Sequence, residues 1–130
     1  MAGDIDYLEP RGMAAPGGHY SHAVRAGTLV FVSGQLPIAA DGARLADQDF
    51  QTQVHQALAN LATALEAANS AVAKLIHVRV YITDINDWPV FDKLYSEWIG
   101  AARPARAVVP VPALHYGFRV EIEAVSGVVQ

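Results

Sequence analysis

The sequence contains no cysteine among its 130 residues. This absence excludes disulfide bonds, thiolate metal ligands and a cysteine nucleophile. Long apolar runs are missing too, since no stretch reaches the roughly 18 hydrophobic residues that span a bilayer. The opening segment, MAGDIDYLEPRG, has neither the basic part nor the apolar part of a secretory signal. We therefore expect a cytoplasmic protein that does not contact a membrane.

Positive charge is scarce, and it is scattered along the chain. The 9 lysine and arginine residues are outnumbered by 13 acidic residues, which gives a net charge of -4 at pH 7. Clustered basic residues that neutralise phosphates supply most of the affinity of nucleic-acid-binding proteins. We therefore expect no nucleic-acid partner. Hydrophobic residues make up 52% of the sequence, enough for the core of a single domain over residues 1–130.

Hydrophobic spacing predicts the secondary structure. Alternating polar and apolar residues indicate strands, and apolar residues at helical spacing indicate helices. Gly27 marks a hairpin turn, and Asn69 is a stop signal for the first helix. The order β-β-β-α-β-α-β-β predicts an α+β domain with two helices on one face of a mixed sheet. The expected strands are residues 5–8, 20–26, 28–35, 76–83, 105–111 and 118–128, and the expected helices are residues 47–68 and 87–100.

One predicted strand carries apolar side chains on both of its faces. Residues 29–32 are Leu-Val-Phe-Val, a pattern typical of strands that are buried on both sides. Two helices can cover only one face of a sheet of about six strands. The second face is then covered by another copy of the chain, or by the sheet itself if it curls. We favour the oligomer.

Arg106 is the first candidate for chemistry, because it lies inside an otherwise apolar strand. An unpaired guanidinium is very costly to bury. Arg106 therefore either forms an ion pair with Glu121 or Glu123, or points into a cleft that receives an anion. A guanidinium can bind both oxygens of a carboxylate, so the second interpretation suits a carboxylate-bearing ligand.

The last predicted strand places two carboxylates on one face. Its alternation puts Glu121 and Glu123 together with Arg119, opposite the apolar side chains. Two such carboxylates could position a water molecule or act as a general base. Alternatively, they form a solvated strand face or pair with Arg79 at a subunit interface.

No other residues form a recognised catalytic or metal-binding motif. The five histidines make no HExxH pattern, and Ser33-Gly34-Gln35 is not the GxSxG motif of serine hydrolases. We therefore expect no metal site.

Several segments, taken in order, resemble the RidA/YjgF-like family. The matching segments are residues 20–27 (YSHAVRAG), 29–37, 61–69, 80–88, 104–106 (PAR) and 120–125 (VEIEAV). Each segment alone is weakly specific, whereas the ordered set from Tyr20 to Val125 is specific.

The resemblance implies both a fold and an activity. Members have a chorismate-mutase-like fold and form homotrimers with ligand clefts between adjacent subunits. Typical members are 2-iminobutanoate/2-iminopropanoate deaminases. They hydrolyse reactive enamines and imines, such as 2-aminoacrylate, to keto acids and ammonia, without a metal or an organic cofactor. The partners that the resemblance implies are therefore a small imino or keto acid and further copies of this chain.

The resemblance also implies roles for particular residues. Arg106 grips the substrate carboxylate, and Glu121 holds or activates the attacking water. The backbone of Val108 helps to place water and substrate. The remaining cleft residues are Tyr20, Ser33 and Gly34.

The chain departs from the family pattern around the expected cleft, although Arg106 and Glu121 are in place. These changes indicate that the substrate can differ from 2-aminoacrylate. Two other functions stay open: a non-catalytic keto-acid-binding or regulatory protein, and a deaminase specialised for a different imine. The departures are His19 for proline, Asp92 for asparagine, Ala107 and Val108 for a hydroxyl residue and a cysteine, and residues 114–117 (LHYG) for the usual turn.

Overall fold

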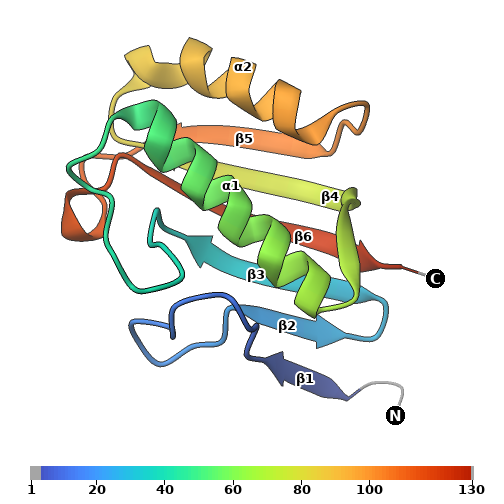
Figure 1. Cartoon of the computed structure of the whole chain (residues 1–130). Coiled ribbons are helices and arrows are strands. Elements are labelled where there is room, and N and C mark those ends of the chain that lie inside the picture. The colour runs from blue at the N-terminus through green and yellow to red at the C-terminus, as the bar shows by residue number, and fades with distance from the viewer. Residues whose placement is uncertain (1–3, 130) are drawn as a thin grey trace.

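The computed structural model describes residues 4–129 and places them in a six-stranded sheet with two α-helices (Figure 1). The order of elements is the predicted one. The strands are β1 (Ile5–Leu8), β2 (Ala23–Ala26), β3 (Leu29–Gln35), β4 (Ser70–Ile82), β5 (Ala105–Pro110) and β6 (Val120–Val128). The helices are α1 (Phe50–Ala67) and α2 (Trp88–Ile99), with two 3-10 turns, η1 (Ile85–Asp87) and η2 (His115–Gly117). Residues 1–3 and 130 lie outside the described residues.

The sheet is mixed, and its strand order is β1-β2-β3-β6-β4-β5. β4 and β5 run parallel, whereas the other neighbouring pairs are antiparallel. A parallel pair needs a crossover connection, and α2 supplies it. Both helices lie on the same face of the sheet (Figure 1), so the predicted α+β architecture is confirmed.

The core lies between the two helices and this face of the sheet. The predicted apolar stripe of α1 faces it, and Val54, Leu58, Leu61 and Leu65 are at most 1% exposed. Burial of each such side chain stabilises the fold by about 1.5–3 kcal/mol. Alternate residues of β4 and β6 complete the core from the side of the sheet, because successive side chains of a strand point to opposite faces.

An aspartate stands at the N-cap of each helix, but only one of the two makes a capping hydrogen bond. α1 begins directly after Asp49 rather than at Asp47, because the Asp49 carboxylate accepts a hydrogen bond from the N–H of Thr52. Asp87 stands at the predicted N-cap of α2 but makes no capping bond. Its carboxylate instead pairs with Arg119 at 2.8 Å. The start of α1 was therefore predicted three residues too early, and Asp87 ties the start of α2 to the residue before β6.

Two strand boundaries differ from prediction by three residues or more, while two predicted turns are confirmed. Residues 20–22 lie outside β2, because side-chain hydrogen bonds hold this segment instead of a strand ladder. β4 begins at Ser70 rather than at residue 76, with register shifts in its first half. Gly27 (φ 61°) and Asn69 (φ 59°) both adopt the left-handed conformation that a hairpin turn and a helix stop require.

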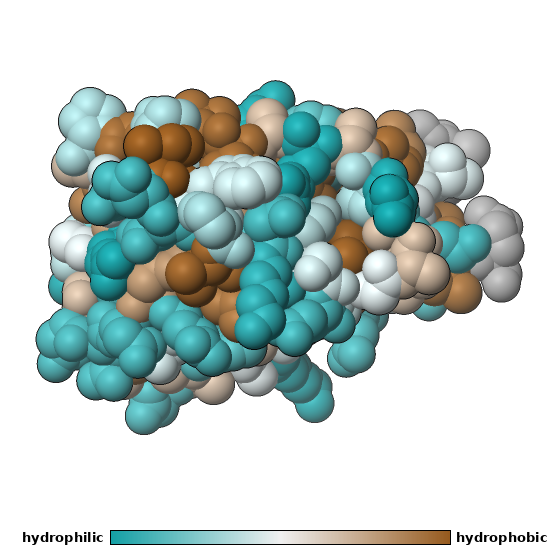
Figure 2. Space-filling model, turned by 90° about the horizontal axis from the view of Figure 1, so that it is seen from above, coloured by the Kyte–Doolittle hydropathy of each residue, from teal (hydrophilic) through white to brown (hydrophobic). Residues whose placement is uncertain are grey.

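The second face of the sheet carries no helix. On this face Leu29 is 39% exposed and Phe31 is 44% exposed. The alternate residues Val30 and Val32 point the other way and are buried in the core. The sheet therefore does not curl over its own second face, and that alternative was wrong. A different side of the molecule, seen from above the view of Figure 1, carries interspersed hydrophobic and hydrophilic side chains (Figure 2). Within residues 4–129, neither helix is long and apolar enough to cross a membrane.

Candidate functional site

A pocket opens where the segment before β2, the end of β3 and the turn η2 meet. Four of the predicted site residues line it: Tyr20, Ser33, Gly34 and Glu121. The chain thus brings a carboxylate, a phenol and a hydroxyl from distant segments into one concave site. The other lining residues are Ala14, Ala15, Gly17, Gly18, Leu36, Ile38, Gly42, Arg44, His115 and Tyr116.

An irregularity in β3 shapes this pocket. The register between β3 and β6 shifts between Val32 and Gln35, so β3 carries an extra residue there, as in a β-bulge. The side chain of Glu121 crosses directly over Gly34. A Cβ at Gly34 would lie 2.2 Å from Oε2 of Glu121. Only glycine therefore fits at this position without displacing the carboxylate.

The environment of Glu121 changes its acidity. Burial raises the pKa of its carboxyl above the ordinary value of 4.5, His115 lowers that pKa, and Glu123 on the same strand face raises it. The raised pKa makes the ionised carboxylate a better proton acceptor than an exposed glutamate. A carboxylate in this environment is suited to accept a proton.

The two hydroxyl-bearing side chains have different environments. The hydroxyl of Ser33 donates a hydrogen bond to the backbone oxygen of Ser21 at 2.6 Å. This bond ties the segment before β2 to β3. Tyr20 is 47% exposed and packs edge-on against His22, with ring centroids 6.1 Å apart. The hydroxyl of Ser33 thus serves the structure, whereas Tyr20 presents its ring to the pocket.

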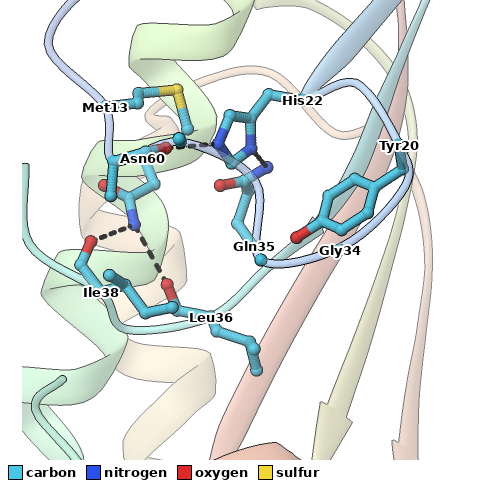
Figure 3. Close-up of a pocket in the computed structure, with 11 residues that line it drawn as sticks. Met13, Tyr20, His22, Gly34, Gln35, Leu36, Ile38 and Asn60 are labelled. Carbon is cyan, nitrogen blue, oxygen red and sulfur yellow. Dashed lines mark hydrogen bonds between the residues drawn. The ribbon is translucent and has the colours of Figure 1, made fainter. Parts of the chain in front are cut away.

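A buried amide and a histidine line an adjacent pocket (Figure 3), which shares Tyr20 and Gly34 with the pocket of Glu121. Nε2 of Gln35 lies 3.2 Å from Nδ1 of His22, and Nε2 of His22 lies 2.8 Å from the backbone oxygen of Ala14. Gln35 also donates to the backbone oxygen of Ser33 at 3.1 Å. These bonds fix the segment that carries Tyr20 against the end of β3.

Two buried amides on α1 hold neighbouring loops. Asn60 donates to the backbone oxygens of Leu36 and Ile38 at 3.0 and 2.9 Å (Figure 3). Gln53 accepts a hydrogen bond from the backbone N–H of Arg119 at 2.9 Å. Apolar periodicity alone does not predict these contacts. The signal in the sequence is a polar residue at core-facing positions of a helix, which must find buried partners.

Arg106 lies away from this pocket, on the helix-covered face of the sheet. Its Nη1 donates to Oδ1 of Asp92 on α2 at 2.8 Å, and its guanidinium carbon lies 4.9 Å from the ring centroid of Tyr95. The alternative that Arg106 pairs with Glu121 or Glu123 was therefore wrong. β4 separates β5 from β6, and the two glutamates project from the opposite face.

A second pocket lies beside Arg106 at the end of α2. Asp92, Tyr95 and Arg106 all line it. The bond to Asp92 uses one of the five N–H donors of a guanidinium, which leaves donors for a ligand. Val108, two residues further along β5, packs its side chain against the core. Because β5 is an edge strand, backbone groups on its outer side are open to a further partner.

Glu123 has a different role from Glu121. It accepts a hydrogen bond from the hydroxyl of Tyr81 and pairs with Arg79 at 3.5 Å. Arg79 and Glu123 thus pair within one chain, on the neighbouring strands β4 and β6, whereas the predicted pairing was at a subunit interface. Glu121 is the carboxylate that lines the pocket.

The histidines are dispersed in the structure. His22 is hydrogen-bonded within the fold, His115 lines the Glu121 pocket, and His55 lies on the exposed side of α1. Among residues 4–129, no group of three or more His, Asp or Glu side chains is placed to hold a metal ion.

Known proteins are similar to this chain in both sequence and fold. The family model described as Endoribonuclease L-PSP matches residues 12–128. A RutC family protein of Pyrococcus horikoshii is 37% identical over 111 residues, which cover 85% of this chain and 88% of that protein. The human 2-iminobutanoate/2-iminopropanoate deaminase is 34% identical over 114 residues, covering 86% and 83%. The crystal structure of RidA from an Antarctic Psychrobacter is 30% identical and covers 95% of this chain and 99% of that one, with a TM-score of 0.89.

The chain belongs to the YjgF/RidA family. The match begins before β2 and ends in β6, so it includes both helices and both pockets described above. The resemblance seen in the sequence is therefore confirmed.

Proposed function

We propose that the protein hydrolyses reactive imines or enamines of small carboxylic acids and releases a keto acid and ammonia. The observation that carries this proposal is the half-buried carboxylate of Glu121, which lies over Gly34 in a pocket beside Tyr20. Support also comes from the family, since a human relative is named as a deaminase of 2-iminobutanoate and 2-iminopropanoate.

The chemistry needs few protein groups. An imine carbon is electrophilic, above all when its nitrogen is protonated, so water can attack it without a nucleophilic side chain. Glu121 accepts a proton from that water as the C–O bond forms. Glu121 then returns this proton to the nitrogen of the resulting amino alcohol. As the C–N bond breaks, the hydroxyl gives its proton to Glu121 and becomes the carbonyl of the keto acid, and ammonia is released. Positioning and one carboxylate base account for catalysis of this kind.

The guanidinium of Arg106 is suited to hold the substrate carboxylate, because its planar fork can donate two hydrogen bonds. In one chain, however, Arg106 and Glu121 project from opposite faces of the sheet. We therefore propose a homotrimer whose clefts combine two copies of the chain. One copy supplies Glu121 and the lining around it, and the next supplies Arg106 and the backbone of Val108.

The open face of the sheet supports such an assembly. Leu29 and Phe31 are large apolar side chains that a single chain leaves exposed. Contiguous exposed apolar surface commonly marks an interface between proteins. A second copy that covers this face would bury it in the way predicted from the sequence.

An endoribonuclease activity, which the description of the family model names, is not part of the proposal. The net charge is -4, and Arg44 is the single lysine or arginine in the lining of the Glu121 pocket. RNA binding rests on clustered positive charge. RNA binding that weakens steeply with salt would argue against our proposal.

The experiment generates 2-aminoacrylate in situ with a dehydratase and follows its disappearance together with ammonia release. Wild type should accelerate both, and Arg106→Ala should not, while its size-exclusion profile stays unchanged. Arg25→Ala is the matched control, since Arg25 pairs with Asp6, away from both pockets. Full activity of Arg106→Ala would refute the role of Arg106. Keto-acid binding without any acceleration would identify a non-catalytic binding protein.

A further inference from the structure

A second positive charge lines the pocket of Glu121. Arg44 reaches it from the loop between β3 and α1, and its guanidinium carbon lies 3.7 Å from the ring centroid of Tyr116. Stacking on an aromatic ring uses the face of a guanidinium, so the N–H groups, which lie in its plane, stay available for an anion. In the part of the chain that the structure describes, no carboxylate forms an ion pair with Arg44.

The backbone that carries Arg44 is tied down. Arg44 forms an isolated β-bridge with Ile38, another residue that lines the pocket. The loop closes through a turn in which the carboxylate of Asp41 accepts a hydrogen bond from the N–H of Ala43 at 2.9 Å. Arg44 therefore projects from a short hairpin-like loop with internal hydrogen bonds, which fixes the origin of its long side chain.

The aromatic partner of Arg44 is also fixed, and at a conformational cost. Tyr116 has φ 61° and ψ 14°, the left-handed region that residues with a side chain seldom occupy. Its ring packs edge-on against Phe118, with centroids 5.9 Å apart. Such strain persists only where the surrounding structure enforces it, and it concentrates at ligand sites. Here the result is a ring held against the guanidinium of Arg44.

We propose that Arg44, supported by Tyr116, is a second anion-binding subsite, and that the substrates are imino acids with a second carboxylate. The inference rests on the proposed function. Arg106 would bind the carboxylate next to the imine carbon, and Arg44 would bind the distal carboxylate. Glu121 would accept a proton from the attacking water. A small monocarboxylate would leave the charge of Arg44 without a partner.

The test compares two imines generated in situ by an amino-acid oxidase, one from glutamate and one from 2-aminobutanoate. Wild type should hydrolyse the dicarboxylate imine with a kcat/KM about tenfold higher than the monocarboxylate imine. Arg44→Gln should remove this preference, mainly through a higher KM for the dicarboxylate. Tyr116→Phe should keep it, because the ring face that supports Arg44 remains. Lys74→Gln, the same loss of charge at an exposed residue outside both pockets, is the matched control.

Binding of the keto-acid products separates this inference from the proposed function. If wild type hydrolyses neither imine but binds 2-oxoglutarate more tightly than 2-oxobutanoate, and Arg44→Gln abolishes the difference, the subsite stands and the deaminase proposal fails. If wild type hydrolyses both imines equally and Arg44→Gln leaves the ratio unchanged, the subsite is overturned and the deaminase proposal stands. Absence of both hydrolysis and binding preference would refute both.

Discussion

At the residue scale, the pocket is organised around the contact between Glu121 and Gly34. Two physical effects meet there. Burial raises the proton affinity of the carboxylate, and the missing side chain of Gly34 allows the carboxylate to lie close to the backbone of β3. His115 acts in the opposite direction, since its positive form favours the ionised carboxylate. Changes at any of these three residues should therefore alter activity in different ways.

The first prediction concerns pH. Glu121 must be ionised to accept a proton, and its pKa is raised, so kcat/KM should fall on the acid side through an inflection above 4.5. Glu121→Gln should lower kcat/KM by about 100-fold or more and remove this inflection. His115→Gln should move the inflection to higher pH, because His115 lowers the pKa of Glu121. A shift to lower pH in His115→Gln would contradict the assignment.

The second prediction concerns Gly34. In Gly34→Ala the new methyl group would lie within 2.2 Å of Oε2 of Glu121, so the carboxylate must move. We expect kcat to fall by about 10- to 100-fold, as misplacement of a catalytic group by an ångström does, while circular dichroism stays native. Gly127→Ala is the control, since its Cβ would come no closer than 3.9 Å to another atom. Equal activity of the two variants would show that the position of Glu121 is unimportant.

At the scale of elements, α1 does more than cover the sheet, because its buried amides fix the loops that line the pocket. Asn60 satisfies two backbone oxygens of the segment after β3, and Gln53 satisfies the N–H of Arg119 just before β6. Removing such an amide takes a hydrogen-bond partner from each of these backbone groups. The stability of the pocket is thus coupled to one face of one helix.

The third prediction tests this coupling. Asn60→Ala should lower the free energy of unfolding by about 1–3 kcal/mol, because the oxygen of Ile38 loses its side-chain donor and the oxygen of Leu36 keeps only the N–H of Ile38. Thr63→Ala, one turn further along α1, should change it by less than about 0.5 kcal/mol, since Thr63 bonds only within the helix. Urea unfolding of both variants measures the difference. Similar values for the two would show that Asn60 does not hold the loop.

The elements themselves follow from local patterns, whereas the site contacts do not. The apolar stripe of α1, the alternation in β6 and the turn at Gly27 each depend on residues close in sequence, and each was predictable. The contact of Glu121 with Gly34 depends on a register shift between β3 and β6, and the partner of Arg106 depends on how α2 packs on β5. Such choices are decided by tertiary packing, so Asp92 could not be distinguished from Glu121 or Glu123 as that partner.

At the scale of the whole molecule, the two faces of the sheet have different surroundings. The helices cover one face, and the other exposes the side chains of Leu29 and Phe31. The carboxylate and the arginine of the proposed site also project from opposite faces. Both observations are explained together if copies of the chain associate through the open face.

The fourth prediction is the oligomeric state. Wild type should have three times the mass of one chain by light scattering. Phe31→Arg should give a folded monomer without deaminase activity, because it places a charge in the proposed interface. Val90→Arg introduces the same charge on α2, at a side chain that is 45% exposed, and should leave the trimer intact. A monomeric wild type with full activity would exclude the assembly.

Mixing two inactive variants tests most directly whether the site is shared between copies. Arg106→Ala and Glu121→Gln should each be inactive alone. After equal mixing by unfolding and refolding together, about one quarter of the clefts of a cyclic trimer combine an intact Arg106 with an intact Glu121 from the neighbouring copy. Deaminase activity should therefore return to about a quarter of the wild-type value. If the mixture stays inactive although mixed trimers form, Arg106 and Glu121 do not act across a subunit boundary.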